Sequence, residues 1–250
     1  MVVVASLGVA GLSACRSEPS VAAYIGDSER ITQDRVDAVY NEVRDKLQAS
    51  PPAAQAPDGQ PAATSSGPAA VPITRADVVS LLIGSKVIDK LAADQSIPAP
   101  TADQLQEPGL AGVLHLPADS EYAQLYAKWL YEIETLRDKV ATPVDPTDAE
   151  LHQVHDALVG MQGYDPSAPF SKFKSDIAAS TNMAVLKQAA GLRNEIAKTT
   201  SQLDVRVNPR YQPTKMPVLV TQNQQTGAIV SLITMPIGPD DQISPVTDAR

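Results

Sequence analysis

Apolar residues recur at intervals of three and four along most of this chain, and that spacing predicts amphipathic helices. It predicts helices over 33–48, 75–91 and 171–199. The helix over 75–91 is opened by the capping box "TRAD" at 74–77, and a further helix is opened by the capping box "TDAE" at 147–150. The clearest helix follows Ser120, which lies where an N-cap is expected. Only 4% of the residues are aromatic, so we expect aliphatic side chains and alanine to fill the core. The apolar stripe after Ser120 consists of Tyr122, Leu125, Tyr126, Trp129, Leu130, Ile133, Leu136 and Val140.

Short extended segments lie near both ends of the chain. The stretch "VAAYIGDSERI" at 21–31 predicts a hairpin that turns at Gly26 and Asp27, because both residue types tolerate the dihedral angles of tight turns. The alternation of apolar and polar residues over 203–207 predicts a strand. The segments "VLVT" and "AIVSLIT" predict a second hairpin, and residues 236–250 are expected to form no regular structure. The expected fold class is therefore mainly α with a small β component.

Residues 49–73 are rich in proline, alanine, glycine and serine and have almost nothing to bury. This composition predicts a disordered loop. A domain boundary is the alternative, but one strand pair and one helix cannot form a core on their own. We therefore expect the segments on the two sides of the loop to pack together.

The first fourteen residues carry no charge and end directly before Cys15, the single cysteine of the chain. The run is too short to span a bilayer but has the length of the apolar region of a secretory signal. The residues "LSAC" resemble the lipobox of bacterial lipoproteins, which implies a signal over 1–14, lipidation of Cys15 and a tether over 15–20. No basic residue precedes Arg16, so either the true start lies upstream or the run is a buried strand with an incidental cysteine.

The formal net charge is −9, and no run of lysine or arginine could follow a phosphate backbone, so nucleic acid is not an expected partner. One cysteine can form neither an intramolecular disulfide nor a cysteine-based zinc cluster. His115 has no serine or cysteine partner in a recognisable motif, and no nucleotide-binding or hydrolase motif occurs. We therefore expect no cofactor and no enzymatic activity.

Two groups of side chains merit attention as possible sites. His152 and His155 lie three residues apart, where both could reach one metal ion, but without a third ligand a solvated helix face is the better interpretation. Tyr122, Tyr126 and Trp129 form an aromatic stripe that either packs in the core or makes a face for apolar peptides. We expect packing to be the commoner role of such a stripe.

Three stretches carry a resemblance to a known family: "VAAYIGDSERITQDRVDAVYNEV", "TPVDPTDAELHQVHDAL" and "LDVRVNPRY". Together they resemble SurA-like and PrsA-like extracytoplasmic chaperones over most of residues 20–211. The resemblance implies that N-terminal and C-terminal segments pack into one chaperone domain over 21–211, followed by a hairpin and flexible tail over 212–250. In that family a parvulin isomerase domain is inserted, but only a short loop separates Met161 from Phe170, so isomerase activity is not implied.

The resemblance implies a protein that binds unfolded or exported polypeptides through apolar grooves between helices. With the lipobox, it implies a lipid anchor in the cell membrane on the extracytoplasmic face. "GDSER" and the proline-rich insertion at 49–73 depart from the family pattern. A non-enzymatic envelope scaffold or interaction lipoprotein is the alternative, and the sequence indicates no oligomeric state.

Overall fold

The N-terminal hairpin begins the part of the chain that the structure, a computed structural model, describes: residues 20–49, 71–105, 116–139 and 142–237. Strand β1 (Val21–Ile25) pairs antiparallel with β2 (Glu29–Thr32), which confirms the predicted hairpin. Gly26 has a φ of +62°, and its N–H donates to the carbonyl of Leu203 at 2.6 Å. Glycine adopts this left-handed conformation at little cost, so the turn residue also fixes the contact with the end of a distant helix.

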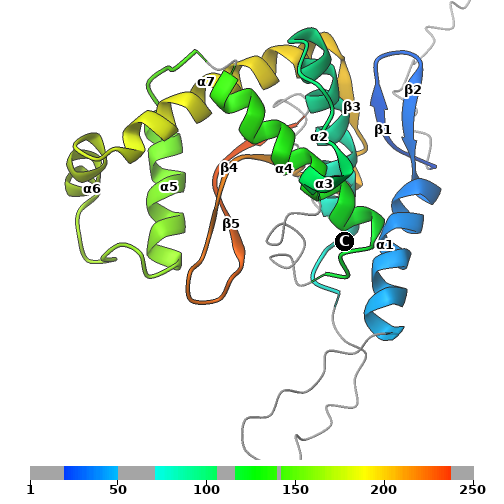
Figure 1. The fold of residues 1–250 in the computed structure, drawn as a ribbon, viewed down its shortest axis with the longest axis horizontal. Coiled ribbons are helices and arrows are strands. Elements are labelled where there is room, and N and C mark those ends of the chain that lie inside the picture. The colour runs from blue at the N-terminus through cyan, green and yellow to red at the C-terminus, as the bar shows by residue number, and fades with distance from the viewer. Residues whose placement is uncertain (1–19, 50–70, 106–115, 140–141, 238–250) are drawn as a thin grey trace, which may run out of the picture.

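A strand from the far end of the chain completes this sheet. Strand β3 (Val205–Val207) pairs antiparallel with β1, with Ala23 opposite Val207, and gives the strand order β2-β1-β3. Asn208 reinforces the junction, since its N–H donates to the carbonyl of Ala22 at 2.9 Å and its side-chain amide donates to that of Val21 at 3.0 Å. Figure 1 shows β3 beside the hairpin.

Helix α1 (Gln33–Ala49) follows the hairpin directly, and the hydroxyl of Thr32 accepts a hydrogen bond from the N–H of Arg35 at 3.2 Å. Helix α2 (Arg75–Asp94) begins at the predicted capping box, in which Thr74 and Asp77 satisfy each other's backbone N–H groups. Helix α2 packs against α1, α4, α7 and strands of both sheets. The segments before and after the proline-rich stretch therefore share one core, while residues 50–70 of the predicted loop lie outside the described residues.

Helices α3, α4 and α5 follow α2 along the chain. The short helix α3 (Ala102–Leu105) lies against α4 (Glu121–Lys139). The hydroxyl of Ser120 accepts from the N–H of Ala123 at 3.3 Å, so the predicted cap is confirmed. Helix α5 (Asp148–Gly160) begins at the second predicted capping box, formed by Thr147 and Glu150.

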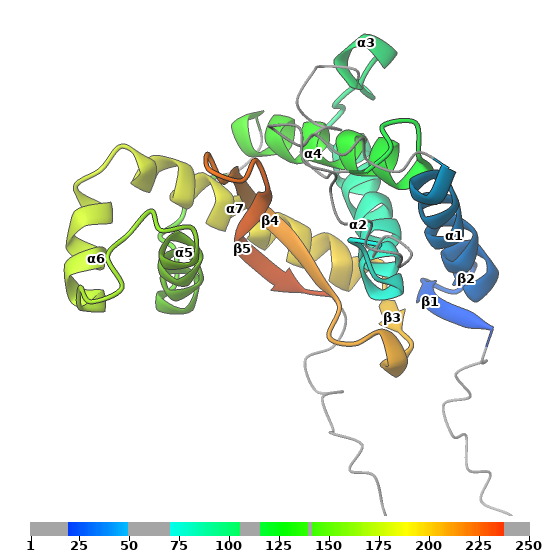
Figure 2. The same cartoon turned by 90° about the horizontal axis from the view of Figure 1, so that it is seen from below.

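The single long helix predicted over 171–199 is wrong, because the chain forms two helices there. Helix α6 (Phe170–Ala178) ends before Ser180, and α7 (Asn182–Gln202) starts in a different direction, as both views show (Figures 1 and 2). The hydroxyl of Ser180 donates to the carbonyl of Ile177 at 2.9 Å. Serine, threonine and asparagine follow one another at 180–182, and such side chains compete with helical hydrogen bonds.

The second sheet is an antiparallel pair of β4 (Lys215–Gln222) and β5 (Ile229–Pro236), as predicted. A 3₁₀ turn, η2 (Pro209–Tyr211), connects it to β3. The predicted trailing segment starts too early at 236, since Ile237 is buried and its N–H donates to the carbonyl of Thr214 at 2.9 Å. The hairpin shares the core of the helices through Met216, Val218, Leu219, Ile233, Met235 and Ile237.

Seen from below, the α5–α6 pair and the β1–β2 hairpin lie at opposite ends of the fold, with β4, β5 and part of α7 between them (Figure 2). Helices dominate and the strands are few, so the expectation of a mainly α fold with a small β component is confirmed. The β4–β5 hairpin contacts α2 and α7 through β4, and α5 through β5.

Candidate functional site

A pocket of about 280 Å³ lies where α2, α4 and the β4–β5 hairpin meet. Helix α4 packs on α2, and β4 contacts α2 as well. The three elements come together at Gly84, because a β-carbon there would lie 2.9 Å from Sδ of Met216 and 3.6 Å from Nε1 of Trp129. The lining residues are Asp77, Ser80 and Leu81 of α2, Tyr122, Tyr126 and Trp129 of α4, and Lys215, Met216, Pro217, Ser231 and Thr234 of the hairpin.

The aromatic stripe of α4 forms one wall of this pocket. The rings of Tyr122 and Tyr126 are 6.3 Å apart and nearly parallel, and those of Tyr126 and Trp129 are 5.3 Å apart and tilted by 44°. Tyr122 and Trp129 are 6% and 2% exposed, whereas Tyr126 is only half-buried. Tyr122 and Trp129 therefore contribute to the core, and all three side chains line the pocket.

The phenol groups of this wall keep their protons at neutral pH. Burial raises the pKa of the Tyr126 hydroxyl to about 12. Burial also raises the pKa of Tyr122, and the negative charge of Asp77 and the neighbouring Tyr126 act in the same direction. Within the described part of the chain neither hydroxyl makes a hydrogen bond, so both are available as donors to a ligand.

Two other polar groups of the lining already have partners. The carboxylate of Asp77 accepts from the N–H and the hydroxyl of Thr74, at 2.7 and 2.8 Å. The N–H of Thr234 donates to the side-chain oxygen of Gln153 on α5 at 2.8 Å, and its hydroxyl donates to the same oxygen at 3.2 Å. Thr234 and one carboxylate oxygen of Asp77 thus stabilise the fold, and among the described residues the other oxygen of Asp77 has no hydrogen-bond partner.

Sequence reasoning identified the α4 wall but missed the wall made by β4 and β5. Lys215, Met216 and Pro217 belong to a segment that the sequence placed after the chaperone domain. A signal existed in the alternation of β4, where buried Met216 follows an exposed lysine. Nothing in that alternation indicated which helices the hairpin would meet, because its partners are far away in the sequence.

The two histidines of α5 do not share a purely solvated face. His152 is exposed, but its ring stacks on Phe170 of α6 at 3.6 Å between centroids. His155 is half-buried, with Tyr164, Phe170 and Phe173 at 5.1–5.7 Å and its Nδ1 3.1 Å from the carboxylate of the neighbouring Asp156. Among the described residues no group of three or more His, Cys, Asp or Glu side chains could hold a metal ion.

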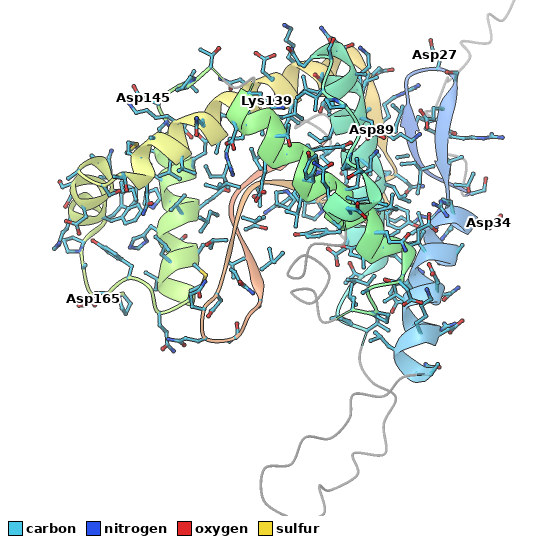
Figure 3. The ribbon with its side chains drawn as sticks, in the orientation of Figure 1. Asp27, Asp34, Asp89, Lys139, Asp145 and Asp165 are labelled. Carbon is cyan, nitrogen blue, oxygen red and sulfur yellow. The ribbon has the colours of Figure 1, made fainter. Side chains whose placement is uncertain are left out.

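A buried carboxylate on α4 was also missed by the sequence. Glu132 is 3% exposed, with one oxygen 3.5 Å from the ammonium of Lys128. Lys128 in turn pairs with Asp89 of α2, the residue labelled in Figure 3. Burial raises the pKa of Glu132 to about 7, Lys128 opposes that effect, and Asp89 adds to it. The only sequence signal was an ionisable residue next to the apolar stripe with a lysine four positions earlier.

Cys15, His115 and Val140 lie outside the described residues, as do the other residues of the lipobox. In the described ranges, no helix combines the length and the apolar character that crossing a bilayer requires. A search of family models, curated proteins and solved structures found no match to this chain.

Proposed function

We propose that this protein is a lipid-anchored, extracytoplasmic polypeptide-binding protein of the SurA-like type, without isomerase or other enzymatic activity. The observation that carries the proposal is the pocket between α2, α4 and the β4–β5 hairpin. Apolar side chains of an unfolded or exported polypeptide would enter it beside Tyr126 and Trp129. The lipobox residues at Cys15 support the anchor, and the resemblance of three segments to SurA-like proteins supports the polypeptide ligand.

The pocket has the chemistry that such a ligand requires. Leu81, Met216 and Pro217 provide an apolar lining opposite the aromatic wall, and methionine adapts to side chains of different shape. Its volume is near the lower end of the range for ligand sites, about 300 Å³, so it suits one or two side chains rather than a folded element. Binding of one side chain at a time is compatible with many different clients.

The test measures binding of fluorescently labelled, permanently unfolded peptides and the delay of aggregation of a chemically unfolded reporter enzyme. The full chain in stoichiometric excess should bind the peptides and delay aggregation. Tyr126→Ala should weaken peptide binding about tenfold, because it removes roughly 1–2 kcal/mol of apolar contact. Failure of the unchanged protein in both assays would remove the proposed chaperone function.

Two further variants separate the pocket from general damage to α4. Ser231→Phe adds a bulky side chain to the lining without removing a core contact, and should weaken binding as Tyr126→Ala does. Tyr131→Ala truncates another half-buried tyrosine of α4, whose hydroxyl pairs with Gln104 at 2.7 Å outside the pocket, and should leave binding unchanged. Equal effects of all three variants would argue against the pocket.

The anchor is tested by the intact mass of protein extracted from membranes. A species that starts at Cys15 and carries added acyl chains is expected, since two chains hold a soluble domain on a bilayer. An unmodified chain that still begins at Met1 would contradict the anchor. One stable partner in place of a range of unfolded peptides would instead favour the alternative of an envelope scaffold.

A further inference from the structure

The lining of the pocket offers several hydrogen-bond donors. Among the described residues, the hydroxyls of Tyr122 and Tyr126 and the ammonium of Lys215 have no hydrogen-bonded or ion-paired partner. Asp77 carries the one carboxylate of the lining, and one of its two oxygens accepts from Thr74. This carboxylate lies at the N-terminus of α2, where the helix dipole offsets part of its charge. A ligand with an acceptor beside its apolar part can bind to these donors.

Lys215, like Lys139 and Lys198, forms no ion pair with another described residue. Most described lysines form ion pairs: Lys46, Lys86, Lys90, Lys128, Lys172, Lys174 and Lys187 each lie within 4 Å of a carboxylate. Lys215 is exposed at the start of β4, lines the pocket, and forms no ion pair within the described ranges. No carboxylate of the described residues pairs with it, so a carboxylate that arrives with the ligand can do so.

We propose that the pocket selects polypeptide segments in which an acidic side chain lies within two residues of the apolar side chain that fills it. This inference rests on the proposed function and names its ligand more closely. The apolar side chain contacts Tyr126, Trp129 and Leu81, and the acidic one pairs with the ammonium of Lys215. The two phenol hydroxyls of the aromatic wall remain as donors to the peptide backbone.

The net charge of −9 opposes this selection, but only weakly at physiological salt. Exposed charges are screened beyond about 8 Å at 0.15 M salt, so the nearest cation outweighs distant carboxylates. The labelled aspartates Asp27, Asp34, Asp145 and Asp165 lie at separate points around the outline of the fold (Figure 3). None of these four lines the pocket, where Asp77 carries the one carboxylate of the lining.

The experiment uses four peptides that differ only next to a central Phe-Leu pair in a Gly-Ser background. Three have acetylated and amidated ends and carry Glu, Gln or Lys two residues after the pair. The fourth has no flanking charge but ends directly after the pair with a free carboxylate. Binding of the full chain at 0.15 M salt is measured by fluorescence anisotropy.

The Glu peptide should bind about threefold tighter than the Gln peptide, and the Gln peptide tighter than the Lys peptide, which is the scale of a partly exposed ion pair. Lys215→Glu should reverse this order. Lys198→Glu is the matched control, because Lys198 is also exposed and unpaired within the described residues but lies on α7 outside the pocket lining. It should preserve the order.

The outcomes distinguish the preference for acidic peptides from polypeptide binding itself. Equal binding of the three blocked peptides, still weakened by Tyr126→Ala, would overturn the acidic preference and leave polypeptide binding intact. A preference limited to the peptide with the free end would overturn it in favour of recognition of chain termini. No binding of any peptide would remove both the preference and the proposed function.

Discussion

The backbone of Thr142 lies directly against Gly191 of helix α7. A β-carbon at position 191 would stand 2.9 Å from the carbonyl carbon of Thr142 and would overlap its oxygen. Nearby, the N–H of Val144 donates to the carbonyl of Lys187 at 3.1 Å, so this crossing is fixed by a hydrogen bond as well. Position 191 requires glycine because two backbones meet there.

Gly191→Ala should therefore destabilise the protein, by about 2 kcal/mol or more, because the obstacle is backbone and cannot rotate away. Alanine would otherwise favour a helix by up to about 1 kcal/mol. Gly160→Ala is the matched control: a β-carbon at that position of α5 meets nothing within 4 Å, and stability should rise slightly. Urea unfolding measures the stability of both variants. Equal unfolding midpoints for Gly191→Ala and Gly160→Ala would contradict the close approach of Thr142 to Gly191.

Asn208→Ala should loosen the junction between the two ends of the first sheet. The change removes the hydrogen bond to the carbonyl of Val21 and the one that Asn208 accepts from the N–H of Arg210 at 3.2 Å, at a cost of about 1–2 kcal/mol. Hydrogen exchange of the β1 amides should accelerate along with the loss of stability.

A matched change tests whether this loss is local to the sheet. Asn223→Ala removes two hydrogen bonds in the β4–β5 turn, which Asn223 accepts from the N–H groups of Gln225 and Thr226 at 2.8 and 3.2 Å. It should leave exchange in β1 unchanged. If Asn208→Ala also left β1 protected, the side chain of Asn208 would have no role in joining the strands.

Glu132→Gln should change how stability depends on pH. The folded-state pKa of Glu132 is raised to about 7, above its unfolded value near 4.5, so the folded state binds more protons between these limits. The contribution of this group to stability is fully present below about 4.5 and is lost as the pH rises through 7. The variant should thus be more stable than the unchanged protein at pH 8, by about 1 kcal/mol or more.

Chemical unfolding between pH 4.5 and 8 measures this difference for the variant and for Glu134→Gln, which changes an exposed glutamate of the same helix. The control should follow the unchanged protein at every pH. A stability gain for Glu132→Gln that stayed constant with pH would show that the carboxyl does not change its protonation in this range.

Local patterns predicted the elements of this fold well. Both capping boxes, the hairpin turn at Gly26 and the cap at Ser120 depend on residues within four positions of each other, so the sequence displays them directly. The break near Ser180 was missed, because three weak helix formers inside an apolar periodicity give no local signal strong enough to decide between a bend and a continuous helix.

The candidate pocket could be only half predicted. Its aromatic wall is a helical stripe that any periodicity reveals, whereas Lys215 and Met216 enter the pocket through packing between segments far apart in the chain. Periodicity also could not show that Tyr126 stays half-buried while Tyr122 and Trp129 are covered. The burial of each ring depends on which elements pack against it, and the spacing of residues in one sequence does not show which elements these are.

The pairing of β1 with β3 sets an order of events when the chain is made. The first strand emerges from the ribosome early, but Ala23 cannot find Val207 until nearly all of the described chain has followed. Until then one edge of β1 has no partner, and contacts this distant in sequence form slowly. The sheet therefore forms completely only when synthesis is almost finished. The nascent chain stays incompletely folded throughout its elongation.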